Sequence, residues 1–283
     1  MLSSLDKEKI QGFIHEKSRI CLQFPDELLA QSSAIVKEIE KLSKNTIALY
    51  VMADTTFGSC CVDKVAAEHG NADGIIHFGD ACLSKPSSDS VPVLWIFAQV
   101  PCNMENLISA LANRPKSSIT IVMSDTASSE SLLQAQATCD CKELIFSKIM
   151  SQWTNKDDLK LGNNQYDVFG RFFELPSGIS SADTDLFFIG NSALTLSNLT
   201  LTLNPKNVFS FDPETGTTTE HNGQASSSIR RRFTLVQKAK VANTIGIVVG
   251  TLGVCKYIET SLIADDERIF HSLGRAVLIP RKR

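Results

Sequence analysis

The sequence predicts an α/β protein built from βαβ units with parallel sheets. Short apolar runs of strand length alternate along the chain with segments of helical pattern, which is the signature of βαβ units. Several of these runs, such as residues 74–78 (GIIHF) and 185–189 (DLFFI), are apolar at consecutive positions. Runs of this kind are typical of parallel strands that are covered on both faces.

The first set of elements occupies the N-terminal part of the chain. Residues 19–24 form the first apolar run, and Pro25-Asp26-Glu27 then marks a helix start. Proline suits the first turn of a helix, and acidic side chains there favour the helix dipole. Apolar residues at helical spacing continue this helix to Leu42. The other elements of the set are expected strands at 46–52, 74–78 and 91–97 and expected helices at 61–69 and 103–111.

Two further sets follow the same alternation. The second has expected strands at 118–123, 143–149, 185–189 and 207–211, with helices at 129–137 and 192–203. The third has expected helices at 229–242 and 256–263 and expected strands at 244–249 and 276–279. A lone strand with one or two helices cannot bury its own faces. We therefore expect the third set either to extend an earlier sheet or to be part of a larger domain.

Domain boundaries follow from these sets. We expect a first α/β domain at residues 1–115, a second at 116–226 and a partial third at 227–283. Polar stretches rich in turn-forming residues predict a surface loop at 85–90 and linkers at 155–165 and 213–228. Three expected strands close on glycine, at Gly79, Gly190 and Gly250. This pattern indicates either repeated domains or the common way in which a parallel strand enters a turn.

Composition argues against nucleic-acid and membrane partners. The formal net charge is -3, and the basic runs at 230–232 and 281–283 are short. No apolar run approaches the roughly 20 residues that span a bilayer, and residues 1–11 lack the apolar core of a secretory signal. We therefore expect a cytoplasmic protein. In that compartment cysteines are mostly reduced, and clustered cysteines indicate metal or redox chemistry.

Three cysteines follow two of the expected strands. Cys60 and Cys61 follow the strand at 46–52, and Cys82 follows the strand at 74–78. One helix joins these strands, so a right-handed crossover makes them near neighbours. Because ligands gather outside the carboxyl ends of parallel strands, we expect the three thiols to face one common site. Cys61 is also expected near a helix N-terminus, where the dipole stabilises a thiolate.

A metal is the favoured interpretation of this site. The spacing matches neither C-x-x-C zinc sites nor ferredoxin runs, and two or three thiolates are few for a closed tetrahedral zinc site. They suit an Fe–S cluster that is completed by a distant ligand or that keeps an open iron. The alternative is that these cysteines are buried and behave as small apolar residues.

The other cysteines are weaker candidates. Cys21 and Cys102 are expected to be packing or surface residues. Cys139 and Cys141 are expected to lie in an exposed loop. Cys255 follows another strand end and is a weak candidate for a further metal ligand.

Polar residues near the cysteines have structural interpretations. His77 lies inside an expected strand, so we expect a core histidine whose hydrogen bonds are satisfied. Asp54 and Asp80 lie beside the cysteine loops. We expect both carboxylates to form hydrogen bonds within turns rather than to contact a substrate.

Several segments together resemble the diphthamide synthesis family. They are LQFPDELL at 22–29, DTTFGSCCVDKVAAEH at 54–69, IHFGDACLS at 76–84, GRFFELP at 170–176, RRRFTLVQKAKVA at 230–242 and IGIVVGTLGV at 245–254. The pair GSCCVD and GDACLS is the most specific part. The resemblance covers most of the chain and is greatest to the second of the family's two homologous subunits.

This resemblance implies similar α/β domains of the diphthamide synthase type, two complete here and a truncated third, arranged around a [4Fe-4S] cluster. It implies a heterodimer with the homologous first subunit. Such a complex cleaves S-adenosylmethionine by a radical route and moves the 3-amino-3-carboxypropyl group to a histidine of translation elongation factor 2. The first subunit carries catalysis, while the second binds its own cluster and supports reduction of the partner's cluster by an electron-donor protein. Motif matching implies Cys61 and Cys82 as cluster ligands, with Cys60 as the neighbouring alternative.

The sequence departs from the family pattern near its C-terminal end. Family members continue through a full third domain that supplies a further cluster cysteine followed by proline, and no Cys-Pro pair occurs in this sequence. We therefore expect a truncated isoform or an incomplete gene model. Two other hypotheses stay open, namely a partner-binding module without a cluster and an unrelated redox protein that uses Cys60 and Cys61.

Overall fold

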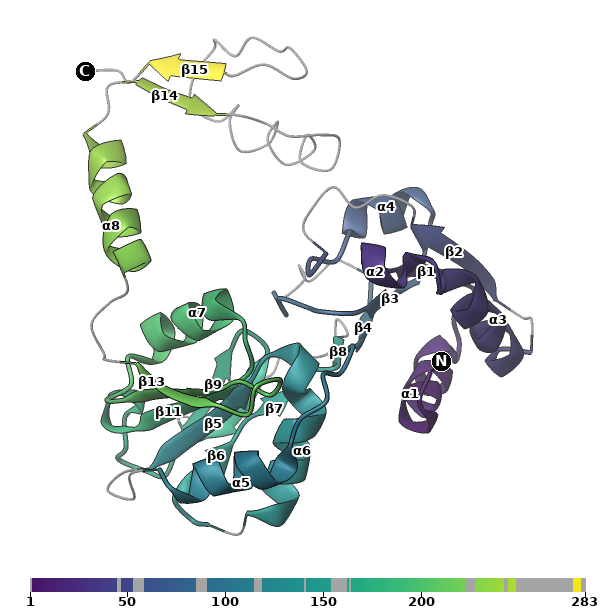
Figure 1. Cartoon of the computed structure of the whole chain (residues 1–283). Coiled ribbons are helices and arrows are strands. Elements are labelled where there is room, and N and C mark those ends of the chain that lie inside the picture. Colours follow the sequence, from purple (N-terminus) through teal and green to yellow (C-terminus); the bar gives the residue numbers. More distant parts are fainter. Residues whose placement is uncertain are drawn as a thin grey trace. The chain divides into compact units, whose positions relative to one another are not determined.

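The computed structural model describes residues 2–44, 47–52, 59–84, 91–114, 119–139, 141–153, 162, 164–221, 227–241, 244–247 and 277–280 (Figure 1). Backbone contacts divide the chain into two units, Met1–Gly223 and Gln224–Arg283. In the part of the chain that the structure describes, the first unit contains two five-stranded sheets and a small three-stranded sheet, and the second contains one helix and a strand pair. The predicted α/β class is confirmed.

The first sheet has the strand order β2-β1-β3-β4-β8. Its strands are β1 (Arg19–Gln23), β2 (Ala48–Met52), β3 (Gly74–Phe78), β4 (Val93–Ile96) and β8 (Gln152–Trp153). The first four are parallel, and β8 pairs antiparallel with the edge of β4. The chain passes from β1 to β2 on one side and then to β3 on the other side, so the strand order reverses at β1. A reversal of this kind is a topological switch point, where α/β sheets bind ligands.

The predicted adjacency of the strands that precede the cysteines is therefore wrong in detail. β1 lies between β2 and β3 and pairs with both of them. The connection from β2 to β3 passes over one strand, which remains compatible with a parallel crossover. The cysteine loops consequently flank the carboxyl end of β1.

Helices cover both faces of the first sheet. The helices α1 (Ser4–Ile14) and α3 (Ser32–Leu42) contribute buried residues to one core cluster, while α2 (Asp26–Leu29) forms a short turn after β1. The helix α4 (Lys64–His69) packs Ala67 into the cluster on the other face. Sequence analysis assigned no element to residues 4–14. A capping box between Ser3 and Asp6 starts α1, and its buried Ile10, Phe13 and Ile14 attach it to the core.

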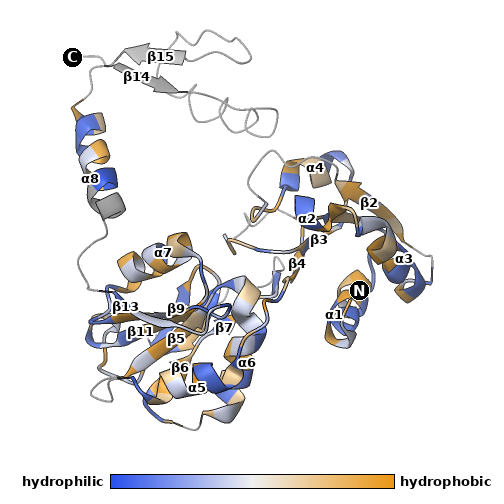
Figure 2. Ribbon diagram, viewed as in Figure 1, coloured by the Kyte–Doolittle hydropathy of each residue, from blue (hydrophilic) through white to orange (hydrophobic). Residues whose placement is uncertain are grey.

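The second sheet has the order β13-β12-β11-β5-β6. Its strands are β5 (Thr120–Ser124), β6 (Leu144–Phe146), β11 (Asp185–Ile189), β12 (Val208–Phe211) and β13 (Thr218–His221), and β13 is antiparallel to β12. One face packs against the helices α5 (Met104–Ala112) and α6 (Ser129–Thr138), and the other packs against α7 (Ala193–Leu203). In Figure 2 the strands β2 and β5 are orange, while α1 and α3 carry both blue and orange.

The two five-stranded sheets repeat one design. Corresponding strands pair in the same order and the same register, down to the antiparallel edge strand. Equivalent pairs are Ile20 with Gly74 and Thr120 with Asp185, Ile75 with Val93 and Leu186 with Val208, and Val93 with Trp153 and Val208 with His221. The strand-end glycines are also equivalent, since Gly79 donates to Ile96 and Gly190 donates to Phe211, each over 2.9 Å. Repetition is thus confirmed for the first two sets, whereas Gly250 lies outside the described residues.

The remaining strands correct two expectations. The expected strand at 143–149 breaks at Ser147, so that β6 stays in the second sheet while β7 (Lys148–Ile149) joins the sheet β7-β10-β9. The strands β9 (Gln165–Val168) and β10 (Arg171–Glu174) form a hairpin that sequence analysis did not predict. Its two-residue turn, Phe169-Gly170, has positive φ at both positions, as tight hairpins require.

The expected linker at 213–228 also contains regular structure. β13 occupies part of it, and α8 (Ser227–Lys240) begins inside it. In the second unit β14 (Thr244–Ile247) pairs antiparallel with β15 (Val277–Pro280). The expected helix at 256–263 and the loop at 85–90 lie outside the described residues.

In the described parts of the chain, no helix combines the length and the apolar character that crossing a bilayer requires.

We expect Gly79→Ala to lower the free energy of unfolding by about 2 kcal/mol or more, because a left-handed backbone and steric overlap each cost about 1–2 kcal/mol. Gly79 has φ +94°, and a Cβ there would lie 2.8 Å from Pro25 Cγ. Gly178→Ala is the matched control, since Gly178 has φ +85° but no atom within 4 Å of its would-be Cβ. Urea denaturation measures both variants. Equal losses of stability would show that the contact with Pro25 is unimportant.

Candidate metal centre

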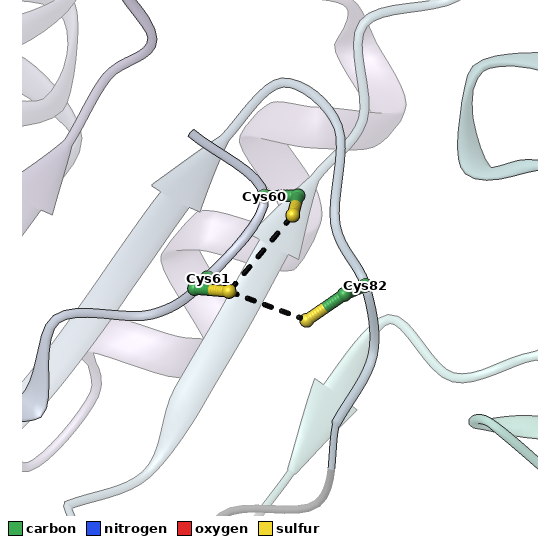
Figure 3. Close-up of side chains that lie close together, drawn as sticks. All are labelled: Cys60, Cys61 and Cys82. Carbon is green, nitrogen blue, oxygen red and sulfur yellow. Dashed lines mark hydrogen bonds between the residues drawn. The ribbon is translucent and has the colours of Figure 1, made fainter. Parts of the chain in front are cut away.

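The sulfur atoms of Cys60, Cys61 and Cys82 lie together at the switch point of the first sheet. Cys61 Sγ lies 3.9 Å from the Sγ atoms of both Cys60 and Cys82, and all three lie within 4.8 Å of one another (Figure 3). Tetrahedral geometry with metal–sulfur bonds of about 2.3 Å separates two thiolates by about 3.8 Å. Cys61 is therefore the central thiol, and it lies from each of the other two at about the spacing of two thiolate ligands on one metal ion.

A backbone hydrogen bond ties the two cysteine loops together. The Cys82 amide donates to the Cys60 carbonyl over 3.0 Å. Cys60 and Cys61 come from the segment between β2 and α4, whereas Cys82 follows β3. The parallel strands bring both segments to the carboxyl end of the sheet. The backbone bond then fixes the position of the two loops relative to each other.

Gln23 anchors the first cysteine loop from the carboxyl end of β1. Its side chain is buried, its Nε2 donates to the Cys61 carbonyl over 2.7 Å, and its Oε1 accepts from the Asp63 amide over 3.0 Å. Asp63 in turn caps α4 by accepting from the Ala66 amide. Sequence analysis missed Gln23. The available signal was an amide side chain at the end of an otherwise apolar run.

The second cysteine loop is anchored by His77 and Thr126. His77 Nε2 donates to the Asp80 carbonyl over 2.9 Å. The Thr126 hydroxyl accepts from the Ala81 amide over 3.3 Å and donates to Asp80 Oδ1 over 3.4 Å. Thr126 belongs to the turn after β5, so the second sheet helps to position Cys82.

The polar residues beside the cysteines match their expected structural roles only in part. His77 is fully buried, and burial lowers its pKa, which keeps the ring neutral. Its Nδ1 has no hydrogen-bond partner among the described residues, so the expectation of a fully satisfied ring is wrong. Asp80 Oδ1 accepts a hydrogen bond from the hydroxyl of Thr126, which lies in another segment, and not from an amide of its own turn as expected. Asp54 lies outside the described residues.

Backbone strain lies beside Cys82. Leu83 has φ +55°, a left-handed conformation that costs a bulky residue on the order of 1–2 kcal/mol. Its side chain is buried, and Gly170 in the β9–β10 turn lies so close that a Cβ there would be 2.8 Å from Leu83 Cβ. Packing against the hairpin thus maintains the strained backbone next to a candidate ligand.

The pKa values of the Cys61 and Cys82 thiols are shifted in opposite directions. Burial, with the neighbouring Cys82 and Cys60, raises the pKa of the Cys61 thiol to about 12. Burial also acts to raise the pKa of Cys82, but hydrogen bonds with Ser84 and with the other thiols outweigh it, so this pKa is lowered. Three adjacent thiols therefore resist full ionisation unless a cation compensates their charges.

The expected helix start at Cys61 is wrong. The helix α4 begins at Lys64 with Asp63 as its N-cap, so Cys61 lies outside the first turn. The dipole effect falls off within that turn.

The other cysteines of the described residues do not belong to the group of three thiols. Cys21 is buried within β1, and Cys102 and Cys139 pack against the core between α5, α6 and the second sheet. Cys141 is exposed. Among the described residues these cysteines form no further metal-ligating group, and Cys255 lies outside that part of the chain.

An aspartate and an arginine lie at the switch point of the second sheet. Asp125 stands where Pro25 stands in the first sheet, packed against the strand-end glycine Gly190. Its Oδ2 accepts from the Asn191 amide over 3.2 Å, and burial raises its pKa. Buried Arg171 donates through Nε to the Ser124 carbonyl over 2.7 Å. The repeat therefore preserves the scaffold but not the chemistry at its switch point.

Known proteins resemble this chain over most of its length. A relative from Schizosaccharomyces pombe, called 2-(3-amino-3-carboxypropyl)histidine synthase subunit 2, is 36% identical over 244 residues, covering 84% of this chain and 47% of the relative. Relatives of the same name from Gallus gallus and Xenopus laevis are 33% and 32% identical and cover 85% and 95% of this chain. The chain spans about half the length of the curated relatives that it matches.

Solved structures share the fold. The crystal structure of Dph2 from Pyrococcus horikoshii with a 4Fe-4S cluster superposes with a TM-score of 0.54 at 19% sequence identity, covering 84% of this chain and 66% of that chain. This likeness shows the architecture. The family model for diphthamide synthesis proteins matches residues 24–263, and the chain therefore belongs to the diphthamide synthesis protein family.

Proposed function

We propose that the chain is an accessory iron–sulfur subunit in diphthamide synthesis. The complex in question transfers the 3-amino-3-carboxypropyl group from S-adenosylmethionine to a histidine of translation elongation factor 2 in the cytoplasm. The carrying observation is the group of three cysteine sulfurs within 4.8 Å of one another in a member of this family. The relatives' name, subunit 2 of a synthase, supports a homologous partner subunit.

The residues present fit an iron–sulfur group. Thiolates are the soft ligands that iron–sulfur clusters prefer. Because each cysteine of a [4Fe-4S] cluster would bind a different iron, the sulfurs of Cys61 and Cys82, which lie 3.9 Å apart in the metal-free chain, would have to move apart to hold it. We assign these two as ligands, with Cys60 as the neighbouring alternative. When bound, a [4Fe-4S] cluster would supply one-electron transfer, here in support of the partner's catalytic cluster and fed by an electron-donor protein.

An accessory role agrees with how the surrounding polar side chains are used. Gln23, His77 and Thr126 are all buried, and each forms at least one hydrogen bond to the main chain of a cysteine loop. They hold the ligands rather than present groups to a substrate. S-adenosylmethionine is accordingly assigned to the partner subunit.

A second candidate function is partner binding without a cluster. The helix α8 exposes Phe233, Leu235 and Val236 by 65%, 55% and 52%. Exposed apolar side chains gathered on one helix favour a protein-binding surface. Cluster binding and partner binding can be measured separately, so the two candidates are distinguishable.

Anaerobic reconstitution with iron and sulfide tests the ligand assignment. We expect the wild-type chain to gain visible thiolate-to-iron absorbance, and Cys61→Ala and Cys82→Ala to lose most of the bound iron, because each removes a thiolate from the cluster. Cys141→Ala is the control, since Cys141 is exposed and does not belong to the group of three thiols. Wild-type iron content in both ligand variants would show the assignment to be wrong. Loss in Cys60→Ala with retention in Cys61→Ala would assign Cys60 instead.

Co-purification with the homologous first subunit tests the partner proposal. We expect Leu235→Asp to weaken the complex. The substitution removes an apolar contact, and an unpaired carboxylate is costly to bury in an apolar interface. Leu133→Asp on α6 is the matched control, since Leu133 and Leu235 are both 55% exposed. Pull-down with the tagged partner measures both variants. Equal retention of the partner by the two variants would show that α8 is not part of the interface.

A further inference from the structure

Gln23 lies at the end of the strand that runs between the two cysteine loops. It ends β1, the strand that pairs with both β2 and β3, and it is 1% exposed. A buried amide is costly unless its donor and acceptor are both used. Both are used here, and both partners are backbone groups of the loop that carries Cys61.

The two bonds hold the peptide groups on both sides of Val62. Gln23 Oε1 accepts a hydrogen bond from the Asp63 amide over 3.0 Å, and Gln23 Nε2 donates one to the Cys61 carbonyl over 2.7 Å. Rotation of the main chain at Cys61 or Val62 would therefore break at least one of these bonds. Since Asp63 also caps α4, the loop is fixed between a central strand and a helix.

Cys82 is held by a different set of residues. His77 binds the Asp80 carbonyl, and Thr126 binds Asp80 and the Ala81 amide. The two loops meet through the bond from the Cys82 amide to the Cys60 carbonyl and through the thiol contacts. Separate anchors allow each loop to be loosened on its own by a single substitution.

We propose that Gln23 is a positioning residue that presents the Cys61 thiol to the other two cysteines and so determines how tightly the site binds a metal. The inference rests on the proposed function for the identity of the metal, but its geometry concerns the metal-free chain. Outer hydrogen bonds that orient metal ligands change metal affinity by about 10- to 100-fold when they are removed.

Two substitutions separate positioning from general stability. Gln23→Met keeps a side chain of similar length and removes both hydrogen bonds. Gln23→Glu keeps an acceptor for the Asp63 amide and removes the donor to Cys61. Thr126→Val is the comparison variant, because it removes the hydroxyl that holds the Cys82 loop.

The first measurement is Co²⁺ binding to the reduced, metal-free full chain under anaerobic conditions. Thiolate-to-cobalt absorbance gives the affinity. We expect Gln23→Met to weaken Co²⁺ binding by about 10- to 100-fold and Gln23→Glu to weaken it in the same direction. Affinities within twofold of the wild type in both variants would overturn the inference.

The second measurement is iodoacetamide labelling of the metal-free chain, read cysteine by cysteine by peptide mass spectrometry well below the melting temperature. We expect Gln23→Met to speed labelling of Cys61 by about 10-fold, because the loop opens more often without its anchor. Labelling of Cys82 is expected to change in Thr126→Val instead. Buried Cys21, which is 2% exposed, reports global opening.

The labelling pattern decides the outcome even if the proposed function fails. A wild-type chain that binds no metal would refute the proposed function, while selective labelling of Cys61 in Gln23→Met would still support positioning. Equal acceleration of Cys61, Cys82 and Cys21 would mean that Gln23 only stabilises the fold, and this result would overturn the inference. Unchanged labelling of Cys61 would overturn it as well.

Discussion

The pairing of β1 with both β2 and β3 is the constraint on which the cysteine site depends. Because β1 lies between them, the segments that follow β2 and β3 leave the sheet on either side of its carboxyl end. Gln23 ends β1 and reaches the Cys61 loop. The Cys82 amide then closes the arrangement on the Cys60 carbonyl. Hydrogen bonding of the sheet therefore determines which thiols meet.

The second sheet shows that this scaffold does not by itself specify chemistry. It repeats the strand order and register of the first, with Gly190 equivalent to Gly79. At its switch point Asp125 replaces Pro25, with buried Arg171 nearby. The two sheets are nevertheless joined functionally, because Thr126 after β5 anchors the loop of Cys82. One repeat thus supplies the candidate ligands, and the other supports one of them.

Three adjacent thiols are difficult to ionise together, and a bound metal cation makes their ionisation favourable. The pKa of Cys61 is raised to about 12 by burial and by its two neighbours, so the metal-free cluster favours protonated sulfur at this position. A cation reverses that preference by compensating the thiolate charges. The hydrogen-bonded loops bear the cost of bringing the thiols together, including the left-handed backbone at Leu83.

Much of the fold and of the site followed from the sequence because the relevant signals are local. The apolar run GIIHF predicted β3, and cysteines after two strands predicted a shared site. The order β2-β1-β3 did not follow, since apolar strands carry no mark of which neighbour they pair with. Gln23, the Phe169-Gly170 hairpin turn and the anchoring by Thr126 also escaped prediction. Sequence alone determined which residues have metal-binding chemistry, whereas tertiary structure decided which of them meet and what holds them, because those contacts join segments far apart in the chain.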